Sequence, residues 1–150
     1  MKILKFQKNK IYLQSDEVID INRDIKVKYK IETEGEISFE QYKNIIYDSA
    51  LSKSYFLLSR RDYTIKDLLQ KLRMKYKKNA IVEEQLQKVI FKLSKLGYLN
   101  DYNYAESYIN IKKQLGRKRI EYELYLKGID SSTIDSIYGK KEIDEKKIIL

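Results

Sequence analysis

Two recurring clusters of basic side chains are the residues of this chain whose type and spacing could do chemistry. Arg60 and Arg61 are adjacent, and Lys112 and Lys113 form a second adjacent pair 52 residues further along the chain. A guanidinium binds a phosphate or carboxylate through two parallel hydrogen bonds, whereas an ammonium acts as a compact charge. The spacing predicts two equivalent contacts with a polyanion or an acidic protein surface. The second pair is followed by three more basic residues: Arg117, Lys118 and Arg119.

A second basic patch is predicted between the two pairs. Residues 50–97 hold twelve Lys or Arg against four Asp or Glu, so most of the net charge of +9 lies there. The patch comprises Lys71, Arg73 and Lys75, followed by Lys77 and Lys78. For this patch the stronger interpretation is an ordinary solvated surface.

The competing interpretation for the first pair is structural. Arg60 or Arg61 could pair with Asp62 or Asp67 between helices, because all four residues lie within one short stretch.

The composition excludes several classes of enzyme. The chain has no Cys and no His, which excludes thiol nucleophiles, disulfides, histidine-based relays and every metal site built on Cys or His. Its five glycines are scattered, and Gly116-Arg117-Lys118 lacks both the upstream glycine and the Ser or Thr of a phosphate-binding loop. We therefore expect a non-enzymatic protein without cofactor or metal.

Apolar stretches in this sequence are only a few residues long, far below the roughly 20 that span a bilayer. Charges interrupt the N-terminal segment, which therefore lacks the apolar core of a signal peptide. We expect a cytoplasmic protein that is monomeric and has no membrane partner.

The elements that must position these side chains change character along the chain. Alternating apolar residues at 4–6, 11–13, 19–21 and 25–31 predict a small antiparallel β meander. From Ser38 onward the periodicity is helical, and both Ser38 with Gln41 and Thr64 with Asp67 have capping-box spacing. Helices are predicted to start at 38, 50 and 64, to follow over 82–96, and then to cover 101–113, 117–127 and 132–138. Gly97 is predicted to end the helix over 82–96.

Sliding the chain along itself by 52 residues reveals an internal repeat. Leu68 then falls on Ile120, Leu72 falls on Leu124, and one basic pair falls on the other. One unit is therefore a three-helix module of about fifty residues, and tandem copies form an elongated array. The fold class is predicted as mainly α, with tandem three-helix repeats after a β meander. The predicted parts are a β extension (1–37), a linking helix with the first repeat (38–97), a second repeat (98–139) and the start of an incomplete third (140–150).

Tyrosines crowd the predicted joint between the modules. Tyr98, Tyr102, Tyr104 and Tyr108 could stack on nucleic-acid bases. The favoured interpretation is structural, because joints between helices commonly bury tyrosine rings and leave the hydroxyl in water.

Four stretches resemble the RecX family, the bacterial regulators of the RecA recombinase. They are LSRRDYTIKDLLQKL at 58–72, LGYLND at 96–101 followed by Tyr104-Ala105, GRKRI at 116–120, and ELYLKGI at 123–129. The resemblance covers roughly residues 50–138 and implies tandem three-helix repeats. It also implies a regulator that lies along the groove of the RecA–single-stranded-DNA filament and limits its growth, strand exchange and ATP hydrolysis. The family usually carries three repeats, whereas this chain has two and a short further segment.

Two other functions stay open at this level. Short helical triads also build helix-turn-helix units, so direct binding to DNA or regulation of transcription is the main alternative. A structural adaptor whose lysines reflect AT-rich coding is the other.

Overall fold

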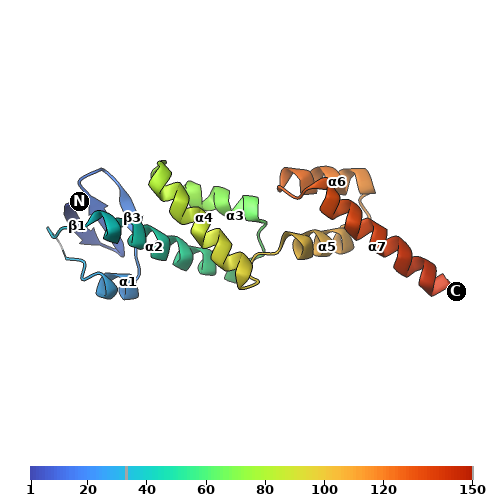
Figure 1. The fold of residues 1–150 in the computed structure, drawn as a ribbon, viewed down its shortest axis with the longest axis horizontal. Coiled ribbons are helices and arrows are strands. Elements are labelled where there is room, and N and C mark those ends of the chain that lie inside the picture. The colour runs from blue at the N-terminus through green and yellow to red at the C-terminus, as the bar shows by residue number, and fades with distance from the viewer. Residues whose placement is uncertain (33, 150) are drawn as a thin grey trace.

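The computed structural model describes residues 1–32 and 34–149, with side chains up to residue 144. It is mainly helical and elongated, with a small sheet at the N-terminal end and the helices following one another along the long axis (Figure 1). The predicted fold class is therefore confirmed.

The N-terminal sheet is an antiparallel meander in the order β1 (Ile3–Gln7), β2 (Lys10–Leu13), β3 (Val18–Asp20). Lys8 and Asn9 connect β1 to β2 with positive φ angles of 52° and 62°, which is the backbone of a type I′ hairpin turn. One face of the sheet contributes to the core through four side chains that are almost fully buried: Ile3, Ile11, Leu13 and Ile19.

The predicted strand over 25–31 was wrong, because these residues belong to α1 (Arg23–Lys28) and the turn after it. Asn22 caps this helix, accepting a hydrogen bond from the Ile25 backbone N–H at 2.9 Å. The alternation also fails to match burial, since Val27 is 67% exposed while Ile25 and Ile31 are buried. A local side-chain cap thus prevails over a pattern of only four apolar residues.

The first helical module consists of α2 (Phe39–Arg60), α3 (Ile65–Arg73) and α4 (Ala80–Lys95). The capping box at Ser38 is confirmed, whereas the helices predicted to start at 38 and 50 are one continuous helix, α2. Gly97, with φ of +84°, follows the end of α4 as predicted.

The second module consists of α5 (Asp101–Ile111), α6 (Arg117–Leu126) and α7 (Ser131–Ile149). The 52-residue shift carries α3 onto residues 117–125, which lie inside α6, and carries α4 onto residues 132–147, inside α7. The helix predicted over 132–138 and the segment predicted to open a further helix are one helix in the structure. The three aliphatic residues at 148–150 lie outside the described side chains.

Each module has its own apolar core. One cluster joins the sheet, α2, α3 and α4, and ends at Leu99, while a smaller one lies within α5, α6 and α7, from Ala105 to Ile137. Among the described residues, no buried side chain belongs to both clusters. The modules are therefore separate packing units.

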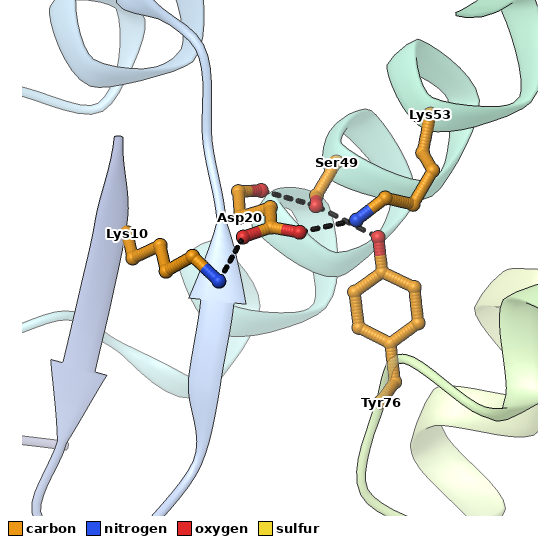
Figure 2. Close-up of polar contacts among 5 residues, drawn as sticks. All are labelled: Lys10, Asp20, Ser49, Lys53 and Tyr76. Atoms are coloured by element: carbon orange, nitrogen blue, oxygen red, sulfur yellow. Dashed lines mark hydrogen bonds and ion pairs between the residues drawn. The ribbon is translucent and has the colours of Figure 1, made fainter. Parts of the chain in front are cut away.

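A polar network fastens the sheet to the first module (Figure 2). The Asp20 carboxylate pairs with Lys53 on α2 and, at 3.4 Å, with Lys10 on β2. Beside it, the Ser49 hydroxyl donates to the Asp20 carbonyl and lies 2.8 Å from the Tyr76 hydroxyl. Burial raises the pKa of Tyr76 to about 12, so the phenol remains neutral in this network.

Candidate functional site

Arg60 and Arg61 lie at the turn between α2 and α3. The backbone N–H of Arg61 donates to Leu57 at 3.3 Å and ends α2, and buried Tyr63 anchors the turn that follows. Each guanidinium lies over an aromatic ring, Arg61 at 4.1 Å from the centroid of Tyr63 and Arg60 at 5.0 Å from that of Phe56. Both arginines are exposed. Stacking orients the two cations and leaves their N–H groups available for a partner.

The alternative interpretation of this pair was wrong for the described residues. Neither arginine forms a salt bridge with Asp62 or Asp67 within the described part of the chain; Asp67 pairs instead with Lys127, at 3.5 Å.

Lys112 and Lys113 occupy the corresponding turn of the second module, between α5 and α6. Lys112 ends α5, with its backbone N–H donating to Tyr108 at 2.9 Å, and its carbonyl accepts from Leu115 at 2.8 Å. Both lysine side chains are exposed, and neither forms a salt bridge with a described residue. The repeat therefore places two basic pairs at matching turns, as the 52-residue spacing predicts.

The three basic residues of α6 occupy an unfavourable place. They form its first turn, where the helix dipole disfavours positive charge, and that turn has no acidic residue and no side-chain cap at Gly116. Arg117 is compensated by Glu121 at 2.7 Å and Asp135 at 3.2 Å. Lys118 and Arg119 are exposed and have no such partner among the described residues.

The second basic patch lies at the C-terminal end of α3. Arg73 forms two hydrogen bonds to Glu83 on α4, one of them 3.0 Å from Nε, and this contact holds the pKa of Glu83 below its ordinary value. Arg73 thus joins two helices. Lys71 and Lys75 are exposed and form no salt bridge with a described residue.

The structure does not gather these basic groups into one patch. The α2–α3 turn lies at the junction of the modules, whereas the α5–α6 turn lies on the far side of α5 and α6, further along the molecule (Figure 1). The basic pairs therefore recur along the long axis at an interval of one module.

The junction that sets this interval was missed by sequence reasoning. Asp101, at the start of α5, accepts a hydrogen bond from the Ile65 N–H of α3 at 3.0 Å. Burial raises the pKa of Asp101, although this hydrogen bond opposes the shift. From the other side, the Lys66 ammonium donates to the Leu126 carbonyl at 3.2 Å, next to the Lys127–Asp67 pair. The one sequence feature at this junction was Asp67, which lies at a capping position of α3. Its ion-pair partner Lys127 is 60 residues away and cannot be read from the sequence.

The partial burial of three of the four tyrosines favours the structural interpretation of this cluster. Tyr102, Tyr104 and Tyr108 are half-buried against the core of the second module. Tyr98 is 55% exposed and meets Tyr55 edge-on, with ring centroids 5.2 Å apart.

Within the described residues, no cluster of three or more carboxylates is arranged to hold a metal ion. No described helix is long and apolar enough to cross a bilayer.

Comparison with known proteins gives consistent results. Residues 100–136, which span most of the second module, match the family described as "RecX, second three-helix domain". The curated "Regulatory protein RecX" of Caldanaerobacter subterraneus is 28% identical, over 96% of this chain and 74% of the relative. That of Finegoldia magna is 33% identical, over 82% of this chain and 64% of the relative.

A solved structure, "Crystal structure of regulatory protein RecX", shares the fold. Its TM-score is 0.57 at 22% identity, over 93% of this chain and 71% of that chain. The chain thus spans between 64% and 74% of the length of these three proteins. Domain match, sequence relatives and shared fold agree in their similarity to proteins of the RecX family.

Proposed function

We propose that this protein regulates RecA-mediated recombination and the SOS response. It binds along the groove of the RecA–single-stranded-DNA filament and limits filament growth, strand exchange and ATP hydrolysis. It acts as a cytoplasmic monomer and as a binding protein, without catalysis or a cofactor.

The observation that carries this proposal is the recurrence of the basic turns along an elongated molecule. A filament presents the same surface at regular intervals, so a ligand with equivalent contacts one module apart can engage successive intervals. Linked contacts strengthen one another, because the second forms at the effective concentration that the first creates. The similarity to proteins of the RecX family supports the same partner.

The basic groups differ in expected contribution. Arg60 and Arg61, with Lys112 and Lys113, are the primary contacts, and Lys118 and Arg119 extend the second one. Arg73 and Arg117 already bind carboxylates within the chain, so we expect their removal to weaken binding less than removal of a free cation. Lys71 and Lys75 form the outer part of the surface.

The test measures inhibition of RecA ATPase on single-stranded DNA. We expect the native chain to inhibit at ratios up to about one protein per RecA. The quadruple variant that replaces Arg60, Arg61, Lys112 and Lys113 with Ser should need at least tenfold more protein. Its binding should also depend less on salt, by about 0.7 in the log–log slope for each cation that contacts a single-strand phosphate.

A matched control removes the same charge from the N-terminal unit. It replaces four exposed lysines with Ser: Lys2, Lys5, Lys8 and Lys30. Equal loss of inhibition in both variants would show that only net charge matters. That result would contradict the proposal that the two basic turns are the contacts. Absence of inhibition by the native chain at large excess would refute the proposed function, and a specific operator footprint would favour a regulator of transcription.

A further inference from the structure

A groove with both apolar and charged lining residues lies between α2 and α4 on the first module, and none of its lining residues is among the basic residues assigned above. Its volume is about 900 Å³. Tyr47 lines it from α2, and Phe91 and Leu96 line it from α4 and the end of α4. Phe91 is 63% exposed and Leu96 is 54% exposed. We refer to it as the α2–α4 groove.

The core of the first module buries neither Phe91 nor Leu96, whereas Tyr47 packs partly against it. α4 buries a different set, which includes Leu86, Val89 and Leu93. The exposed rings of Tyr55 on α2 and of Tyr98, two residues after Leu96, pack edge-on against each other. Isolated exposed hydrophobics are ordinary, whereas several that line one groove are typical of an interaction surface.

Three lysines line the groove on the same side of α4 as Phe91. Lys88, Lys92 and Lys95 are all lining residues, and Phe91 lies three residues after the first and four before the last, which places them on one helix face. Glu84 is the groove's one acidic lining residue and lies 3.6 Å from Lys88 in an exposed pair. The Lys95 ammonium lies over the Phe91 ring at 5.0 Å. The groove therefore combines exposed apolar side chains with a net positive charge.

We propose that the α2–α4 groove binds an acidic amphipathic helix of a protein partner. The lining from Glu84 to Leu96 covers about three turns of α4, or roughly 18 Å at 1.5 Å per residue, which suits a short helix lying alongside. Apolar side chains of that helix, at i, i+3 or i+4, and i+7, contact the exposed apolar lining residues. Its carboxylates, along one flank, pair with the three lysines. This surface is independent of the proposed filament contacts and goes beyond them.

The charge pattern selects this occupant over two others. A second copy of this chain would bring its own groove lysines against those of the first, and like charges across an interface oppose association. A nucleic acid would satisfy the lysines but not Phe91 and Leu96 together, since phosphate contacts do not require exposed aliphatic and aromatic side chains in the groove.

The experiment uses a labelled synthetic helix of eighteen residues and the full chain, without RecA, so that its failure is distinct from failure of the filament proposal. The peptide carries Leu at i, i+3, i+4 and i+7, with Glu on both flanks. We expect micromolar binding by fluorescence anisotropy, and at least tenfold weaker binding when the flanking Glu residues are replaced by Lys.

Two variants and a matched control locate the contact. Phe91→Ser and Lys92→Glu should each weaken binding about tenfold or more. Tyr122→Ser removes an aromatic ring on α6 that is also 63% exposed, and it should leave the affinity unchanged. Circular dichroism confirms that each variant folds, as expected for exposed positions.

Three results would overturn the proposal. The first is equal binding of the Glu and Lys peptides, or binding that Phe91→Ser does not weaken. The second is self-association in analytical ultracentrifugation that Phe91→Ser abolishes, which would make the groove a dimer surface. The third is an oligonucleotide that binds through Phe91 while the acidic helix does not bind.

Discussion

The two modules should respond separately to damage in their cores, and Leu124→Ala tests this. Leu124 is fully buried in the cluster formed by α5, α6 and α7. Removing a buried leucine side chain costs about 2–5 kcal/mol. Taking about 3 kcal/mol, the opening equilibrium of the second module should rise about 150-fold, since 1.36 kcal/mol corresponds to a factor of ten.

The effect on the first module is limited by the junction. What joins the modules includes the Lys127–Asp67 pair, the Ile65–Asp101 hydrogen bond and the Lys66–Leu126 hydrogen bond. A partly exposed pair or a single hydrogen bond each contributes about 1 kcal/mol, so loss of these contacts withdraws roughly 3 kcal/mol from the first module. We expect amides at the start of α3 to exchange up to about 150-fold faster, and those in the middle of α4 to change much less.

Hydrogen exchange with mass spectrometry measures both modules in one sample. The matched control is Leu72→Ala, which removes a fully buried leucine at the equivalent position of the first module and should accelerate exchange in α2, α3 and α4. If Leu124→Ala accelerated exchange in α4 as much as in α6, the modules would unfold as one unit, and the inference from separate cores would be refuted.

Two further predictions concern the sheet and the junction. Burial alone would raise the pKa of Asp20, but Lys53 and Lys10 outweigh it and hold the pKa below its ordinary value; its contribution is present above about pH 4 and is lost as pH falls through the folded pKa. Asp20→Asn should therefore lower the urea midpoint at pH 7 and change it less at pH 3, and an equal change at both would contradict this. Gly128 has φ of +86° and a Cβ there would lie 2.7 Å from the Lys66 Cβ, whereas Gly97 has φ of +84° with open space around it. Gly128→Ala should thus lower the melting temperature more than Gly97→Ala, which carries only the backbone cost of about 1 kcal/mol; equal shifts would remove the steric argument.

Local signals in the sequence predicted most of the helices, because caps and apolar stripes act within a few residues. Ser38 forms the predicted capping box, whereas Thr64 caps its helix only by accepting from the Asp67 backbone N–H, and the Asp67 side chain pairs with Lys127 instead of reaching back. The short reach of local signals also explains the wrong strand prediction over 25–31. There the Asn22 cap starts a helix, and of the alternating apolar residues only Ile25 and Ile31 are buried.

Contacts between distant residues were not predictable from the sequence. The 52-residue repeat predicted that the two basic turns occupy equivalent positions. The Lys127–Asp67 pair, in contrast, joins residues 60 apart and depends on how the two modules contact each other. Phe91 was likewise not singled out from the sequence. Its exposure follows from the way α2 packs against α4, and periodicity alone does not give that direction.

The separation of the cores explains how one small chain can present charge at a defined interval. A single shared core would fix the modules by apolar packing, and the basic turns would move only with the whole fold. Here each module holds its own turn rigidly, through Tyr63 in the first and through the Leu115 hydrogen bond to Lys112 in the second. The interval between the turns depends on a small polar junction that contributes only about 3 kcal/mol. If the proposed function holds, an elongated binder of this construction can adjust its spacing to the filament at small cost while each basic turn keeps its own geometry.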